Sequence, residues 1–139
     1  MSVNIQNIQL LRAQTGAGLL DCKKALIEAE NDVQQAIRLI KATGVELAEK
    51  KAERITADGI AYAGVKDGKA ILLEVNTETD FVSNSPDFRK TVGDIAQTIA
   101  ENEPDNIDRL LQCTCREQSL QVASLLQKMV MTFRENIQL

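Results

Sequence analysis

The sequence predicts an α+β protein in which a bundle of short helices precedes a β-hairpin packed with further helices. Apolar residues recur at helical spacing from residue 4 to about residue 44. After Ile55 the pattern changes to two β-prone runs separated by Asp67-Gly68, and helical periodicity returns from Pro86 onward. A chain of 139 residues suits one ordinary domain, or a very small domain followed by a modest one.

Three short helices are predicted in residues 1–44. The first spans residues 4–14, where Asn4 can cap its start, and it ends at the glycine-rich stretch Thr15 to Gly18. The second spans residues 20–30. The third starts after Asn31-Asp32 and runs to about Thr43, closed by Gly44. The apolar positions that define them are Ile5, Ile8 and Leu11; Cys22, Ala25, Leu26 and Ala29; and Val33, Ala36, Ile37 and Ile40.

A charged segment and a hairpin follow the bundle. Residues 45–55 are helical in propensity and heavily charged, and we interpret them as a linker helix. Two strands are predicted next, Ala57 to Val65 and Lys69 to Val75, because Asp-Gly between β-prone runs is a strong hairpin signal. Two glycines in the first strand suggest a twisted or bulged edge. The second strand leads into a polar, acidic loop, residues 77–83.

Three more helices are predicted after this loop. Pro86-Asp87 opens a long helix that ends near residues 102–105. Two shorter helices are expected at residues 106–112 and 117–133. Residues 136–139 read like the first residues of a strand. The apolar faces of the first and third of these helices are Phe88, Val92, Ile95, Ala96 and Ile99, and Leu120, Ala123, Leu126, Met129, Val130 and Phe133.

Composition and charge exclude several classes of protein. With 44% hydrophobic and 26% charged residues the chain is typical of globular proteins. The formal net charge of −4, concentrated in residues 55–139, and the lack of aromatic residues among basic ones disfavour a nucleic-acid-binding protein. No apolar run approaches the roughly 20 residues that span a bilayer, and there is no signal or transit segment. We therefore expect a cytoplasmic protein with no membrane contact.

Cysteine and histidine usage argues against a metal site or an enzyme. Three cysteines make a poor disulfide framework, and Cys113 and Cys115 are only one residue apart. Without other nearby ligands this pair cannot complete a zinc site, so we interpret the cysteines as buried or incidental thiols. The chain has no His, hence no His-based acid–base pair or triad, and its carboxylates are scattered. The sequence favours a binding protein without a cofactor.

Two stretches resemble the signatures of a known family. Residues 12–26 read Arg-Ala-Gln-Thr-Gly-Ala-Gly-Leu-Leu-Asp-Cys-Lys-Lys-Ala-Leu, and residues 74–84 read Glu-Val-Asn-Thr-Glu-Thr-Asp-Phe-Val-Ser-Asn. In this order they resemble the two signatures of bacterial elongation factor Ts, the guanine-nucleotide exchange factor for elongation factor Tu. Thr77 stands where that family usually has Cys, Ser or Val. The resemblance covers almost the whole chain, least clearly residues 102–116.

The resemblance carries an expected domain organisation. It implies that residues 1–44 form a ubiquitin-associated-like three-helix domain, residues 45–55 a linker helix, and residues 56–139 the N-terminal part of an α+β core. Members of the family normally run well beyond this length, with a second half of the core. We therefore expect the chain to be an N-terminal portion of such a factor, either a fragment or a truncated relative. For a full-length factor the resemblance leaves a homodimer open.

The resemblance also implies a mechanism and its residues. The protein would bind elongation factor Tu in its GDP-bound and nucleotide-free forms, and promote GDP release by displacing Mg²⁺ and loosening the phosphate site. The implied site is Thr79, Asp80, Phe81 and Val82, and further candidate contacts in the N-terminal domain are Arg12, Asp21, Lys23 and Lys24. No residue of this site would itself ligate a metal.

Two alternatives remain at this point. An isolated Phe is usually buried, so Phe81 could belong to the core. The flanking residues match the exchange motif, however, and favour an exposed plug that enters a pocket of the partner. The other alternative concerns function: the chain could be a ubiquitin-associated-like interaction module without exchange activity.

Overall fold

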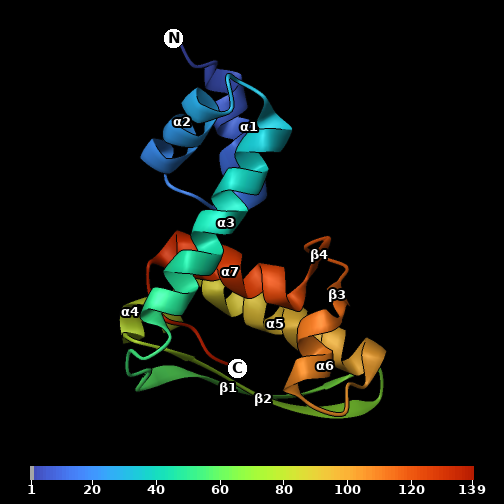
Figure 1. Cartoon of the computed structure of the whole chain (residues 1–139). Coiled ribbons are helices and arrows are strands. Elements are labelled where there is room, and N and C mark those ends of the chain that lie inside the picture. The colour runs from blue at the N-terminus through green and yellow to red at the C-terminus, as the bar shows by residue number, and fades with distance from the viewer. Residues whose placement is uncertain (1) are drawn as a thin grey trace. The chain divides into compact units, whose positions relative to one another are not determined.

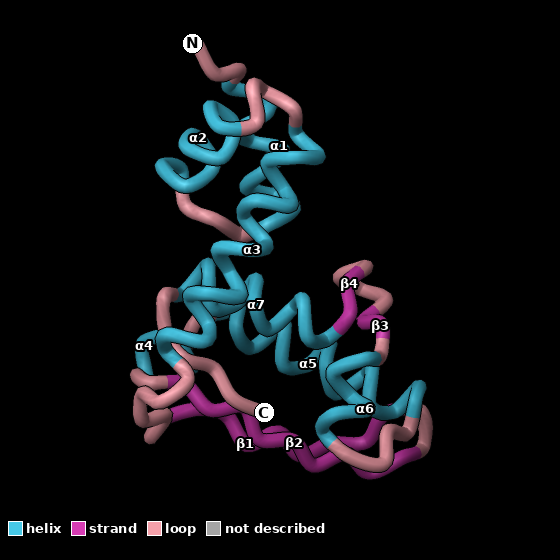
Figure 2. The backbone as a smooth tube through the Cα atoms, in the orientation of Figure 1, coloured by secondary structure: helices cyan, strands magenta, loops and turns pink. Residues whose placement is uncertain are grey.

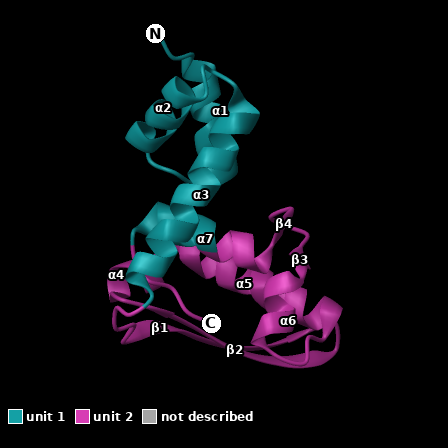
Figure 3. Cartoon of the chain, in the orientation of Figure 1, with its two compact units in different colours: residues 1–52, 127–134 teal, residues 53–126, 135–139 magenta. Residues whose placement is uncertain are grey.

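The structure is a computed structural model that describes residues 2–139 (Figure 1). It is α+β, with three N-terminal helices followed by a β-hairpin packed with helices, as the sequence predicts (Figure 2). The chain divides into two compact units (Figure 3). Unit 1 contains the residues up to Ala52 together with Gln127–Arg134, and unit 2 contains Glu53–Leu126 and Glu135–Leu139. No helix within residues 2–139 is long and apolar enough to cross a membrane.

Unit 1 is built on three helices with well-defined ends: α1 (Ile5–Thr15), α2 (Leu19–Glu28) and α3 (Val33–Lys51). The Asn4 side chain caps α1 by accepting a hydrogen bond from the Gln6 amide at 2.9 Å, as predicted. Gly16 ends α1 in the left-handed conformation, with φ 69°. Asp32 caps α3 in the same way as Asn4 caps α1, accepting from the Gln35 amide at 3.0 Å.

The core of unit 1 includes a contribution from near the end of the chain. Met131 lies in the second half of α7 (Val122–Phe133) and is buried with the three N-terminal helices. Thr132 donates its hydroxyl to the Gly16 carbonyl at 3.1 Å, and the Arg134 guanidinium pairs with the Asp21 carboxylate. The buried members of this core are Leu11, Ala17, Cys22, Ala25, Leu26, Ala29, Ala36, Ile40 and Met131.

The sequence predicted that the third helix would be closed by Gly44, but helix α3 continues through this residue. It is a single helix from Val33 to Lys51. A glycine inside a helix costs only about 1 kcal/mol relative to alanine, and residues 45–51 are mostly strong helix formers. Gly44 also leaves room for Met131 to pack against the helix, because a Cβ on Gly44 would lie 3.3 Å from the Met131 side chain.

Unit 2 is organised around the predicted hairpin of β1 (Asp58–Lys66) and β2 (Lys69–Thr77). The antiparallel register runs from Asp58 opposite Thr77 to Lys66 opposite Lys69 without a bulge. Of the twisted or bulged edge suggested for the first strand, the bulge is therefore wrong. Asp67 and Gly68 have φ 50° and 76°, which is the geometry of a type I′ turn. Alternate residues of β2 are buried, namely Ile71, Leu73, Val75 and Thr77.

Helices cover the hairpin of unit 2. Helix α5 (Pro86–Asn102) packs against both strands and buries Phe88, Val92, Ile95 and Ala96, as predicted. It ends where Glu103 takes the left-handed conformation, and α6 (Ile107–Gln112) follows. In Figure 2 the two long strands run together beside these helices.

Two predictions about the last third of the chain are corrected. Residues 114–121 form a small hairpin, β3 (Thr114–Cys115) and β4 (Leu120–Gln121), where the start of a helix was expected. Helix α7 therefore starts only at Val122, and its buried residues include Val122 and Leu125 in place of the expected Leu120, Ala123 and Leu126. In α1, similarly, Ile5 is 71% exposed and does not share the core with Leu11.

The last residues of the chain form one β-bridge with β2. Gln138 exchanges two backbone hydrogen bonds with Asn76, at 2.8 and 3.0 Å. This antiparallel bridge agrees with the strand character predicted for residues 136–139. It also places that segment beside the point where β2 ends, which is where the candidate site begins.

Candidate functional site

The polar stretch after β2 contains a one-turn helix, α4 (Asp80–Ser83), where a loop was predicted. Thr79 is still extended, and the amide of Asn84 then donates to the Asp80 carbonyl at 2.9 Å, which closes the turn. The Ser83 hydroxyl also donates to the Asp80 carbonyl, at 3.2 Å. Ser85 ends the segment by capping α5 through the Phe88 amide.

Helix α4 directs two neighbouring apolar residues to opposite environments. Successive residues of an α-helix point about 100° apart. Val82 is only 4% exposed, whereas Phe81 is 86% exposed, more than any other large hydrophobic residue that the structure describes as exposed. Helix α4 contacts both β1 and β2, so the buried Val82 fixes the turn on the sheet. Phe81 is therefore presented to solvent from a fixed position.

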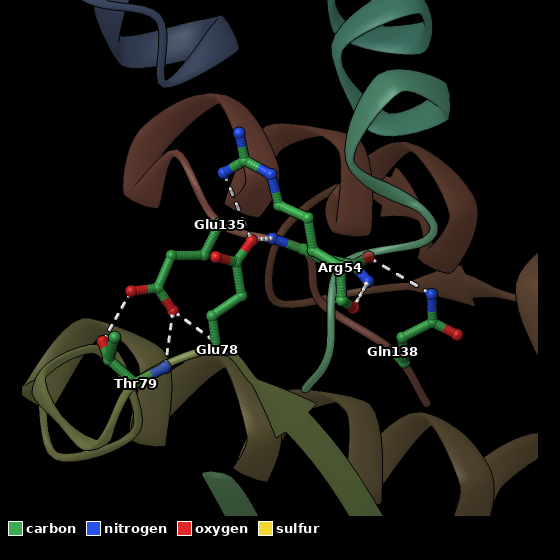
Figure 4. Close-up of polar contacts among 6 residues, drawn as sticks. Arg54, Glu78, Thr79, Glu135 and Gln138 are labelled. Carbon is green, nitrogen blue, oxygen red and sulfur yellow. Dashed lines mark hydrogen bonds and ion pairs between the residues drawn. The ribbon is translucent and has the colours of Figure 1, made fainter. Parts of the chain in front are cut away.

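The backbone just before α4 is held by a carboxylate from the end of the chain. Glu135 Oε2 accepts hydrogen bonds from the amides of Glu78 and Thr79, at 3.0 and 3.1 Å (Figure 4). Its Oε1 accepts the Thr79 hydroxyl at 2.5 Å. Thr79 is thus engaged through both its backbone and its side chain. Thr79, Asp80 and Phe81 are nevertheless exposed to solvent, and only Val82 of the predicted site is buried.

Glu78 completes this arrangement. Its carboxylate accepts the Asn136 amide at 2.7 Å and lies 3.7 Å from the Arg54 guanidinium (Figure 4). The buried side chain of Asn136 donates in turn to the Arg54 carbonyl at 2.8 Å. Sequence analysis missed Arg54, Glu78 and Glu135 as parts of the site. The contacts join residues 24 to 82 positions apart, and no local pattern signals them.

The predicted contact residues of the N-terminal domain lie in unit 1, and the structure shows an ion pair for Asp21. Arg12 lies in the last turn of α1, and Lys23 and Lys24 lie on α2; all three are exposed. Asp21, in the first turn of α2, is paired with Arg134, so its charge is already compensated within unit 1. The exposed Leu19 and Leu20 adjoin these residues in α2, at 56% and 70% exposure.

The thiols lie outside both sets of site residues. Cys22 and Cys115 are buried, Cys113 is half-buried, and all three are free. Burial raises the pKa of the Cys22 thiol, partly offset by the nearby positive charge of Arg12. Within residues 2–139 no group of three or more Cys, Asp or Glu side chains is placed to hold a metal ion.

Comparisons with known proteins agree on one family. The family model for elongation factor TS matches residues 78–139, which contain α4 and Glu135. Elongation factor Ts of Halorhodospira halophila is 39% identical over 140 residues, which cover 99% of this chain and 47% of the relative. The chain belongs to the elongation factor Ts family. Elongation factor Ts of Lactiplantibacillus plantarum is 41% identical over 109 residues, covering 78% of this chain and 37% of the relative.

Membership of the elongation factor Ts family gives the described geometry its context. A further relative, from Alkalilimnicola ehrlichii, is 36% identical over 140 residues, 99% of this chain and 47% of the relative. The chain spans about half the length of the curated relatives it matches. Within the stretch that resembles the family signature, Thr79 is the N-cap of α4, and Asp80, Phe81 and Val82 are its first three residues.

Proposed function

We propose that this chain acts as a guanine-nucleotide exchange factor: it binds elongation factor Tu and promotes release of GDP. The observation that carries the proposal is Phe81, an aromatic side chain 86% exposed on a turn that is fixed by buried neighbours. Exposing a large aromatic residue costs hydrophobic free energy, and such residues are typical anchors of protein interfaces. The protein is a binding factor in this proposal, not an enzyme, and acts in the cytoplasm without nucleic acid.

The proposed mechanism follows from thermodynamic linkage. An exchange factor binds the nucleotide-free partner more tightly than the GDP-bound partner, so by reciprocity it weakens GDP by the same factor. GTPases of this type hold the GDP phosphates with backbone amides, a Lys and Mg²⁺. The Mg²⁺ ion is the largest positive charge at that site, and its displacement loosens the phosphates. We propose that the segment from Thr79 to Val82 causes this displacement.

Each residue of that segment has a distinct part in the proposal. Phe81 enters an apolar pocket between helices of the partner and shifts them. Asp80, exposed at the first turn of α4, accepts hydrogen bonds at the contact. Val82 is buried, so it acts from beneath by seating α4 on the sheet. Thr79 connects the turn to Glu135.

The N-terminal residues supply a second contact in this proposal. We propose that residues 1–44 form a ubiquitin-associated-like domain, that residues 45–55 link it to the core, and that residues 56–139 are the N-terminal part of that core. Arg12, Lys23 and Lys24 then meet an acidic surface of elongation factor Tu. Asp21 contributes by holding Arg134.

The test is the release of labelled GDP from elongation factor Tu with the wild-type chain, Phe81→Ala and Phe81→Leu. We expect wild type to accelerate release, Ala to lose most of the acceleration, and Leu to restore part of it because it keeps the bulk. Val65→Ala is the matched control, since Val65 is 71% exposed but lies at the opposite end of the hairpin. A wild-type chain that binds the partner without accelerating release would instead indicate an interaction module without exchange activity.

A further inference from the structure

We infer that Glu135 is a positioning residue for the exchange reaction: its carboxylate sets the direction in which α4 presents Phe81. The inference rests on the proposed function. Glu135 engages the two residues that precede α4 through three hydrogen bonds, of 2.5, 3.0 and 3.1 Å (Figure 4). Hydrogen bonds to an ionised carboxylate are shorter and stronger than those between neutral groups.

A one-turn helix needs such support from outside. An isolated helix of this length is unstable in water, because the first turn fixes several residues for one hydrogen bond. Within α4, Val82 supplies one anchor by its burial, immediately after Phe81. Thr79 supplies the other, two residues before Phe81, through Glu135. The ring is thus flanked on both sides by fixed points.

The carboxylate of Glu135 is itself fixed by the same two segments. Glu78 donates its amide to Glu135 and accepts the amide of Asn136 with its own carboxylate, at 2.7 Å. Two residues further on, Gln138 pairs with Asn76 of β2. The segment that carries Glu135 is therefore in register with the strand that leads into α4. A carboxylate held in this way can fix the direction in which the chain enters α4 as well as stabilise the fold.

Glu135→Gln is the informative substitution, because it keeps the shape of the side chain and removes its charge. The amide retains only one oxygen, so the three hydrogen bonds to Glu78 and Thr79 can no longer all be accepted. Glu101→Gln is the matched control, because it removes the same charge from unit 2. Glu101 lies on α5 and forms an ion pair with Arg116 at 3.6 Å. Both variants are made in the wild-type chain and in the Phe81→Ala chain.

The measurements are the melting temperature, the affinity for elongation factor Tu and the rate of GDP release at saturating chain. We expect Glu135→Gln to lower the saturated rate about tenfold, as for loss of one hydrogen bond to a charged group. The melting temperature should fall by a few degrees with the lost hydrogen bond, so the rate is expressed per folded molecule. The affinity should change little, and Glu101→Gln should behave as wild type. In the Phe81→Ala chain, Glu135→Gln should have almost no further effect, because it acts through Phe81.

The outcomes separate this inference from the proposed function. If the wild-type chain does not accelerate GDP release, the proposed function fails and the inference fails with it. If the wild-type chain accelerates release and Phe81→Ala is equally fast, Phe81 has no part in exchange and the inference is overturned while the proposed function stands. If Phe81→Ala is slow but Glu135→Gln is as fast as wild type, only the inference is overturned. It is equally overturned if Glu135→Gln slows release to the same extent with and without Phe81, or if its effect disappears when the rate is expressed per folded molecule.

Discussion

Glu135 and Thr79 lie 56 residues apart in the chain and meet through two hydrogen bonds, which the Glu135 carboxylate accepts from the amide and the hydroxyl of Thr79. The contact joins the end of the chain to the residue that precedes α4. It places residues 79–82 on a support that is distant in sequence.

Phe81 and Val82 should respond in opposite ways to truncation. Phe81→Ala removes a side chain that is 86% exposed, so the free energy of unfolding should stay within about 0.5 kcal/mol of wild type. Val82→Ala removes buried methyl groups beneath α4 and should cost about 2 kcal/mol. Urea unfolding of the two variants checks this. A large loss of stability in Phe81→Ala would show that the ring belongs to the core.

Gly16 should tolerate alanine less well than Gly68. Both have positive φ, 69° and 76°, so each substitution should cost about 1 kcal/mol or more in backbone strain. At Gly16 a Cβ would also lie 2.3 Å from Thr132 Oγ1, whereas at Gly68 nothing lies within 4 Å. Gly16→Ala should therefore lower the urea midpoint clearly more than Gly68→Ala. Equal losses would mean that Thr132 moves away without cost.

Stability should fall in alkaline solution partly through Cys22. Burial raises the pKa of this thiol above its ordinary value of 9.0, so above that pH the unfolded chain loses the proton while the folded chain keeps it. The folded state then binds more protons, and the free energy of unfolding decreases as pH rises. Unfolding of wild type and Cys22→Ala between pH 8 and pH 10 should show a shallower decrease in the variant. Parallel curves would contradict this.

The sequence predicted best what depends on neighbouring residues. Asp67-Gly68 fixed the hairpin, and Asn4 marked the start of α1, because turns and caps are formed by adjacent positions. The β3–β4 hairpin was missed because two-residue strands have no periodicity to detect. Helix α3 was predicted too short because Gly44 was interpreted as a local stop, and its packing against Met131 comes from far along the chain.

Within the candidate site, too, features formed by neighbouring residues could be predicted, and those that depend on distant residues could not. The exposure of Phe81 was expected from the signature around it, and the structure places it in solvent. The burial of Val82 depends on α4 forming as a helix, which four residues do not predict on their own. Glu135 carried no signal at all, because its role depends on an antiparallel bridge between Asn76 and Gln138.

The shortness of α4 limits how far this signature can be transplanted. A synthetic peptide of residues 77–84 would contain every side chain of the motif but none of the contacts that shape it, and so would sample many conformations. It would have to give up that freedom on binding, and its affinity would be correspondingly low. A miniature competitor of the natural factor would need at least both strands of the hairpin, which α4 contacts, and the segment from Glu135 to Gln138, which holds Thr79.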